Sequence, residues 1–143
     1  MIEREPIYVA LFNKLSTIPG LVTKSRKLLH WNDVAAEQQP ALFQAQKAET
    51  HTTRTGTPAK VLLELDIYVY VRTSGDASPS TKLNAVLDGI MLALAPNPIN
   101  GRCTLDVPGV EWVRVEGRVE TDEGTLGDQA VAIVPINILC SST

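Results

Sequence analysis

One stretch of the chain alternates between aliphatic and other residues, which is the period of a β-strand. Between residues 60 and 73 the aliphatic positions are Val61, Leu63, Leu65, Ile67, Val69 and Val71. The positions between them hold Leu62, Glu64, Asp66, Tyr68, Tyr70 and Arg72. The pattern predicts a long strand with one face against a core and one mixed face. If helices cover the aliphatic face, the mixed face is left either to solvent or to a neighbouring subunit.

Two other stretches have helical spacing. In residues 3–17 a buried stripe is expected at Ile7, Ala10, Leu11 and Leu15, with Pro6 in the first turn and Pro19-Gly20 after the end. The second helix begins after Ser78, with Pro79 at its first position, and stops before Pro96. Its expected stripe is Leu83, Val86, Leu87, Ile90, Met91 and Leu94.

The remaining strands are less regular. We expect strands at residues 21–31 and 41–49, and a final antiparallel hairpin of residues 111–120 and 129–139 around a turn at 121–127. A short strand at 102–105 is also compatible with the pattern. Residues 32–40 read as a loop, and residues 50–58, which lack apolar side chains, read as a mobile loop or hairpin tip. Pro135 cannot donate to a ladder, so it indicates an edge strand or a bulge.

The resulting order is α-β-β-β-α-β-β. Strands interrupted by helices and joined by antiparallel links indicate an α+β fold. We expect one domain over residues 1–143, with a single mostly antiparallel mixed sheet of about five strands and both helices packed on one face.

Composition and charge narrow the function. The 143 residues are 44% hydrophobic and 20% charged, which favours a folded domain over a disordered chain. The net charge of −3 argues against nucleic acid as a sequence-specific partner. The acidic start of the chain and the lack of an apolar run of about 20 residues predict neither a secretion signal nor a membrane span. Cys103 and Cys140 are isolated, which fits synthesis in a reducing cytoplasm.

Catalytic motifs are absent from the sequence. It contains no phosphate-binding glycine loop, no Gly-x-Ser-x-Gly elbow and no His-Glu-x-x-His pair. Glu64 and Asp66 share a strand face and could bind a metal or share a proton, but a solvated or interface face is the simpler interpretation. His30 and His51 fit structural or surface roles. We therefore expect no enzyme activity, no cofactor and no metal.

Two features favour binding instead. Tyr and Arg are common at the centres of interfaces, and the subunit-interface candidates are Glu64, Asp66, Tyr68, Tyr70, Arg72, Arg114 and Arg118. The candidates for a loop that reaches a partner are His51, Thr52, Thr53, Arg54 and Thr55. Residues 1–72 carry a charge of +2 (nine basic, seven acidic) and residues 73–143 carry −5 (four basic, nine acidic), which is compatible with head-to-tail self-association.

The segments together resemble a known family. An opening helix ends at LSTIPG; RKLLHWNDVAAEQQPALFQAQKAE places a strand after a polar loop; the strand KVLLELDIYVYVRT leads into the helix SPSTKLNAVLDGIMLAL; and the connector APNPINGRCTL precedes VEWVRVEGRVETDEGTLGDQAVAIVPINI. This combination resembles the tail terminator proteins of long-tailed bacteriophages, the family of the lambda minor tail protein U.

The resemblance implies a small α+β subunit that assembles into a hexameric ring. Such a ring caps the head-proximal end of the tail tube, stops its polymerisation and offers a surface for the head connector, with DNA passing through it. The implied partners are copies of itself, the tube protein and the connector, and the implied location is the virion tail, after assembly in the host bacterial cytoplasm. The resemblance fixes no interface position.

Three other interpretations stay open at this stage. A head–tail joining, neck or tail-completion protein has a similar size and fold class. A subunit of a non-viral contractile injection apparatus would share the same physical character. A small hydrolase or ligand-binding domain would need a pocket with convergent polar groups.

Overall fold

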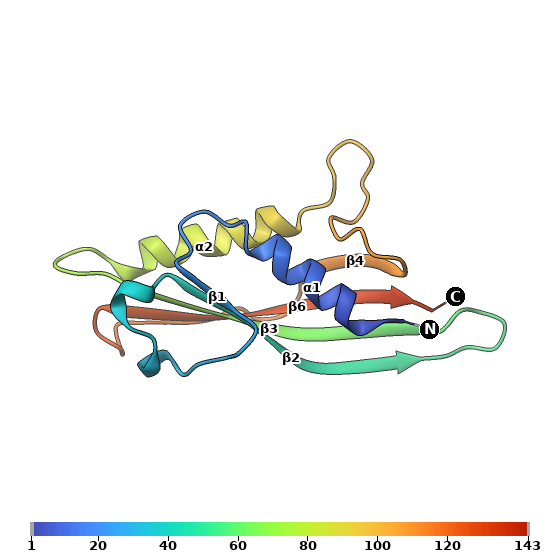
Figure 1. The fold of residues 1–143 in the computed structure, drawn as a ribbon, viewed down its shortest axis with the longest axis horizontal. Helices are drawn as coiled ribbons and strands as arrows, with labels where there is room; N and C mark the ends of the chain where they lie inside the picture. The colour runs from blue at the N-terminus through green and yellow to red at the C-terminus, as the bar shows by residue number, and fades with distance from the viewer. Residues whose placement is uncertain (1, 143) are drawn as a thin grey trace.

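The computed structural model describes residues 2–142 and contains two helices and one six-stranded sheet (Figure 1). The helices are α1 (Arg4–Leu15) and α2 (Pro79–Leu94). The strands are β1 (Thr23–Ser25), β2 (Ala41–Thr52), β3 (Lys60–Arg72), β4 (Val110–Val115), β5 (Glu120–Glu123) and β6 (Gln129–Ser141). Two 3₁₀ turns, Trp31–Asp33 and Ala36–Gln38, lie between β1 and β2.

The sheet is mixed but mostly antiparallel. Its strand order is β1-β2-β3-β6-β4, and β5 also pairs with β6. Only the β1–β2 pair is parallel. The predicted α+β class is confirmed, and the observed order differs from the expected one by a single added strand.

The core lies between the sheet and both helices, which pack on the same face. Buried side chains of α1, such as Ile7 and Leu11, and of α2, such as Val86 and Ile90, join one cluster with the aliphatic face of β3. The six alternating residues from Val61 to Val71 are all buried, as their period predicted. β3 is the centre of this arrangement because it pairs along its whole length with β6 and with β2 on its other side.

Residues 21–31 do not form the predicted long strand. Only Thr23–Ser25 pair with β2, and the chain then runs irregularly over the face of the sheet opposite the helices. There Val34 packs against Phe43 and Tyr70 in a second small cluster. Val34 and the half-buried Trp31 of this segment therefore cover part of the sheet, while Leu28 and Leu29 stay exposed. We call residues 26–40 the cover segment.

The predicted final hairpin is divided into three strands. β4 pairs with Ile136–Cys140 of β6, and β5 pairs with Ala130–Ile133. Between them the amide of Glu116 donates to the carbonyl of Pro135 (3.2 Å). The predicted irregularity at Pro135 is present as this interruption, but β6 is an inner strand, so the edge-strand alternative was wrong.

Two smaller expectations also need correction. Residues 102–105 are not a strand; they follow a turn in which the amide of Gly101 donates to the carbonyl of Asn97 (2.8 Å). Met91 is 57% exposed and lies outside the buried stripe of α2, whereas Leu83, Val86, Ile90 and Leu94 are buried as expected.

Candidate assembly surfaces

The sheet face opposite the helices is only half covered. The cover segment lies over one end of it, and the other end forms a groove of about 410 Å³. We call this uncovered end the open face. Its groove is lined by Lys47, Glu64, Leu65, Asp66, Glu116, Gly117, Arg118, Glu120, Ile133, Pro135 and Asn137. Four carboxylates and two basic groups make the groove acidic on balance.

The structure brings three of the predicted interface residues into this groove, namely Glu64, Asp66 and Arg118. Lys47, at a bulge in β2, lies 3.8 Å from the Asp66 carboxylate. Tyr68 is half-buried at the border with the cover segment. These side chains share one surface because β2, β3 and β6 place them on the same side of the sheet.

Arg114 lies on β4, beside the groove. Its guanidinium carbon is 3.6 Å from the centre of the Trp112 ring, and its side chain pairs with Glu116 at 3.3 Å. Hydrogen bonds from Asn137 and Arg114 hold the pKa of the Glu116 carboxyl below its usual range. Trp112, Leu139 and Leu62 form a half-buried apolar row across the three strands. Sequence reasoning did not single out this row, although the alternation of residues 111–120 places Trp112 beside Arg114.

Tyr70 and Arg72 belong to the covered end and are not part of the open face. Tyr70 is 3% exposed, and its hydroxyl donates to the carbonyl of Leu29 (2.7 Å) in the cover segment. Burial raises the pKa of Tyr70 to about 12. Arg72 donates to the side chain of Gln129 (3.0 Å) and is half-buried. The expected choice between solvent and a neighbouring subunit was incomplete, because this part of the mixed face is covered by the chain itself.

The β2–β3 hairpin forms a second surface at one end of the sheet. In Figure 1 its tip, residues 53–59, extends beyond the ends of the neighbouring strands. Thr53, Arg54 and Thr55 lie in this tip, whereas His51 and Thr52 belong to β2. The hairpin from Thr50 to Lys60 contains His51, Arg54 and Lys60 and no acidic residue.

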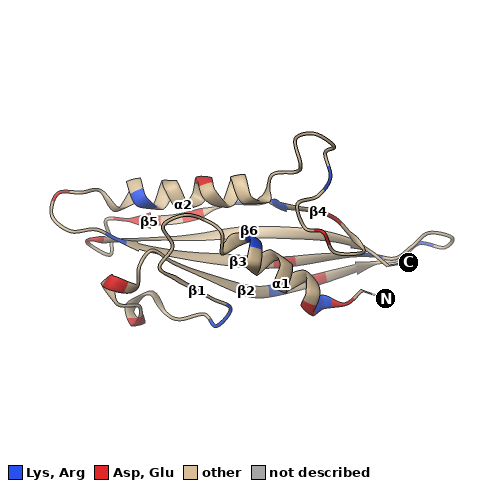
Figure 2. Cartoon of the chain, turned by 45° about the horizontal axis from the view of Figure 1, so that its top comes forward, with Lys and Arg blue, Asp and Glu red and all other residues tan. Residues whose placement is uncertain are grey.

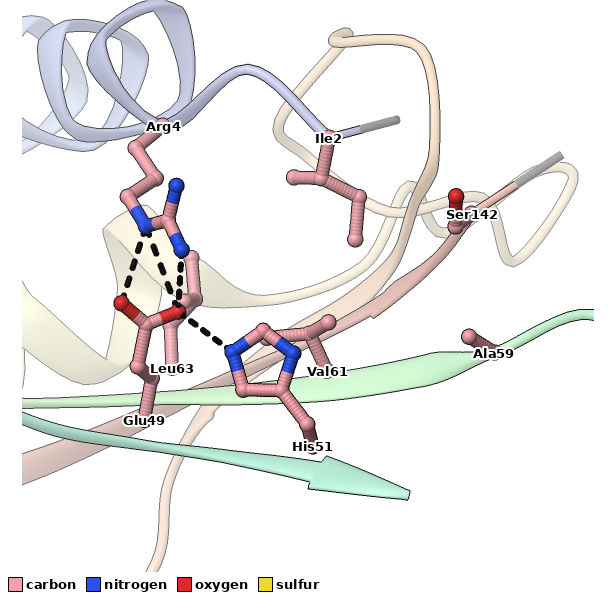
Figure 3. Close-up of a pocket in the computed structure, with 8 residues that line it drawn as sticks. All are labelled: Ile2, Arg4, Glu49, His51, Ala59, Val61, Leu63 and Ser142. Carbon is pink, nitrogen blue, oxygen red and sulfur yellow. Dashed lines mark hydrogen bonds and ion pairs between the residues drawn. The ribbon is translucent and has the colours of Figure 1, made fainter. Parts of the chain in front are cut away.

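A polar cluster ties the hairpin to α1 (Figure 3). Arg4 donates two hydrogen bonds of 2.9 Å to Glu49, and His51 lies 3.0 Å from the same carboxylate. The Arg4 bond lowers the pKa of Glu49. These groups border a surface cavity of about 330 Å³ together with Ile2, Val61 and Ser142. The cluster has the geometry of an exposed salt bridge between two elements.

The outer side of α2 and the loop after it expose apolar side chains. Met91 is exposed, Leu92 is 79% exposed and Ile99 is 93% exposed. This surface lies on the helix side of the molecule. Sequence analysis missed it because Met91 fitted the helical stripe.

Glu64 and Asp66 are the pair that the sequence raised as an alternative metal site. Within residues 2–142, no group of three or more His, Cys, Asp or Glu side chains could hold a metal ion, so Glu64 and Asp66 gain no third ligand. His30 accepts a hydrogen bond from the amide of Asn32 (3.1 Å), a local turn contact. No described helix is long and apolar enough to cross a membrane.

Comparison with known proteins adds a fold likeness. No protein-family model and no curated protein sequence matches the chain. Among solved structures, a chain from the virion of a native gene transfer agent (GTA) particle matches with a TM-score of 0.57 and 11% identity. The match covers 94% of this chain and 93% of that chain. At this identity the likeness establishes a shared fold over nearly the full length of both chains.

Proposed function

We propose that the protein is a structural component of a phage-like virion. The observation that supports this most is the fold likeness to a chain of the gene transfer agent virion, which extends over almost all of both chains. The chain's own features agree with a building block. One apolar core joins the sheet to both helices. The surface features that remain for contacts with other proteins are the acidic groove and the projecting hairpin.

More narrowly, we propose that copies of the protein form a hexameric ring that caps the head-proximal end of a tail tube. The cap stops tube polymerisation and offers its other side to the head connector. A ring arises from heterologous contacts whose rotation closes. In this proposal the open face, with Glu64, Asp66, Tyr68, Arg114 and Arg118, contributes to the contacts between subunits.

The projecting hairpin is proposed to face the tube or the lumen of the ring. Its tip residues Thr53, Arg54 and Thr55 carry little apolar surface, so they contribute nothing to the monomer core. The tip contains the base Arg54 and no acidic residue, whereas Lys60 at its base pairs with Glu111 at 2.6 Å. Through Arg54 the tip is suited to an acidic tube surface or to the phosphates of DNA passing through the ring.

The test is to mix the purified protein with tail tubes and with purified connector, and to image both by negative-stain electron microscopy. We expect closed rings with a central hole, bound at one end of each tube, and tube growth that stops when the protein is added. Binding to the connector without binding to tubes would instead identify a neck or joining protein. A stable monomer that binds neither would contradict the structural role altogether.

A further inference from the structure

The two edges of the sheet carry opposite charge. β1 is one edge, and the segment that contains it, residues 23–27, holds Lys24, Arg26 and Lys27 and no acidic residue. At the other edge, residues 116–123 hold Glu116, Glu120, Asp122 and Glu123 against one base, Arg118. The local balance is therefore +3 at one edge and −3 at the other. Figure 2 shows the blue β1 end and the red β5 end on opposite sides of the sheet.

The two edges also lie at the same level along the strands. Lys24 pairs with Leu42, Leu42 with Val69, Val69 with Ala132, and Ala132 with Thr121 of β5. This row of five strands has Lys24 at one end and Thr121 at the other. Four strand spacings separate them, or about 19 Å. Because that exceeds the Debye length of about 8 Å at physiological salt, the edges neutralise each other little within one copy.

Paired residues share a face of the sheet, so Lys24 lies on the helix side with Leu42 and Val69, whereas Glu120 and Asp122, on either side of Thr121, lie on the opposite side. In a contact between two copies, the charges of the two edges therefore attract across the edge and are not directly opposed pairs.

At each edge, at least one charged side chain already has a partner within the chain. Arg26 pairs with Glu5 at 2.8 Å, and Glu123 accepts a hydrogen bond from the amide of Ser80 at the start of α2. The side chains of Lys24, Lys27 and Glu120 are exposed, and Asp122 is half-buried. In the part of the chain that the structure describes, these four side chains take part in no hydrogen bond or ion pair, so they remain available to a partner.

Strand direction permits direct edge contact. β1 runs parallel to β2, and β2, β3, β6 and β5 then alternate in direction, so β5 runs opposite to β1. A second copy beside the first in the same orientation therefore brings its β1 antiparallel to β5. Charged side chains on edge strands commonly prevent aggregation. Like charges on both edges would have that effect between copies, whereas opposite charges attract.

We propose that a second copy of this chain docks its β1 edge, through Lys24 and Lys27, against the β5 edge, through Glu120 and Asp122. This contact is heterologous, so every copy uses both edges and the assembly grows until it closes. The inference rests on the proposed ring and specifies which edges meet in it. The open face then flanks this contact, because Glu120 also lines its groove.

The test compares the native mass of charge-reversed proteins by analytical ultracentrifugation. We expect Lys24→Glu/Lys27→Glu and Glu120→Lys/Asp122→Lys each to weaken self-association at least about tenfold, since each gives the two meeting edges charge of the same sign. The protein with all four reversals restores opposite charges and should assemble again. Association of the unaltered protein should be weaker at about 0.5 M than at about 0.05 M salt.

Matched controls separate this contact from a general effect of charge. Asp88→Lys, on the exposed side of α2, and Arg102→Glu, in the loop after it, change the same types of charge away from both edges. These variants should keep the oligomeric mass, and circular dichroism should show that all variants fold. The edge contact is overturned if neither double variant changes the oligomeric mass, or if the protein with all four reversals folds but stays monomeric. Either result leaves the proposed ring standing. An unaltered protein that is monomeric at all concentrations and binds no tubes overturns both.

Discussion

Tyr70 illustrates how one side chain fixes the cover segment to the sheet. Its ring packs against Phe43 with 5.4 Å between ring centroids, and its hydroxyl donates a hydrogen bond to the carbonyl of Leu29. Tyr70→Phe keeps the ring and removes the hydrogen bond, so we expect a loss of about 1 kcal/mol in the free energy of unfolding. Urea unfolding measures the loss, and hydrogen exchange should show faster opening of residues 26–40. In Tyr68→Phe, the matched control, stability should change little.

The same residue predicts a response to alkaline pH. Burial raises the pKa of Tyr70 to about 12, while a tyrosine in the unfolded chain titrates near about 10. Its contribution is therefore complete below about pH 10 and is lost as the pH rises towards 12. Tyr70→Phe should lose part of this alkaline destabilisation, and an unchanged alkaline profile would show that other groups cause it.

The two cysteines should differ in reactivity. Cys140 is fully buried on β6, and burial raises the pKa of its thiol to about 11, whereas Cys103 is half-buried in the loop before β4. Because the thiolate is the reactive form, a thiol reagent at neutral pH should modify one cysteine in the folded protein and two after denaturation. Cys103→Ser should abolish the native reaction, and reaction of Cys140 in that folded variant would contradict the placement of β6.

At the scale of elements, the start of α2 is capped from a distant strand. Glu123 of β5 accepts hydrogen bonds from the amide of Ser80 (2.6 Å) and the hydroxyl of Ser78 (3.0 Å). The Ser80 and Ser78 bonds hold the pKa of Glu123 below its ordinary value of 4.5. A carboxylate at this position also complements the positive end of the helix dipole.

Glu123→Gln should therefore lower the melting temperature at neutral pH. Because the pKa of Glu123 is lowered in the folded state, its contribution is present above about pH 4.5 and is lost as the pH falls through the lowered value. The difference in melting temperature between variant and parent should disappear in acid. Asp88→Asn, on the exposed side of α2, serves as the control and should melt like the parent at both pH values.

Close packing of α2 against the loop after α1 depends on Gly89. A Cβ atom at this position would lie 2.7 Å from Cγ2 of Ile18, which is buried. Alanine favours a helix by about 1 kcal/mol over glycine, but overpacking costs about 1–3 kcal/mol. We expect Gly89→Ala to destabilise the protein by about 1 kcal/mol and Ile18→Ala in the same chain to remove part of that penalty. Asn84→Ala, on the exposed side of α2, should not destabilise.

The sequence predicted elements well wherever a single local rule decided the structure. The alternation from Val61 to Val71 and the Ser78-Pro79 start of α2 correspond to the observed elements. The strand predicted over residues 21–31 was wrong for most of its length, because the positions of Leu29 and Trp31 depend on hydrogen bonds from Tyr70 and Gln129, which come from distant strands. The division into β4 and β5 likewise depends on where Pro135 interrupts the ladder. Strand alternation was enough to predict that Glu64, Asp66 and Arg114 lie on the mixed side of their strands. That they lie near Glu116 and Glu120 could not be predicted, because it depends on the order of the strands in the sheet.

At the scale of the whole molecule, the hairpin tip is separable from the core. The last pair of the β2–β3 ladder is Thr52 with Lys60, so residues 53–59 can be replaced by Asn-Gly, which favours a two-residue hairpin turn. We expect this variant to fold and to keep the oligomeric mass but to lose tube capping or head joining. Normal tail length and normal joining would contradict the role proposed for the tip. Thr125→Ala, in the turn between β5 and β6, is a control at another exposed turn.

The pairing of β3 with β6 also has a kinetic consequence. This ladder joins residues far apart in the chain, and one side-chain contact within it, Lys60 with Ser141, spans 81 positions. Folds dominated by such distant pairings form slowly, because a long loop must close before its contacts are gained. The two edges join one sheet only through this ladder, because β1 pairs with β2 on one side of it and β5 pairs with β6 on the other. A chain that has not yet folded therefore cannot present the two edges on one sheet, and slow folding limits the supply of subunits able to associate.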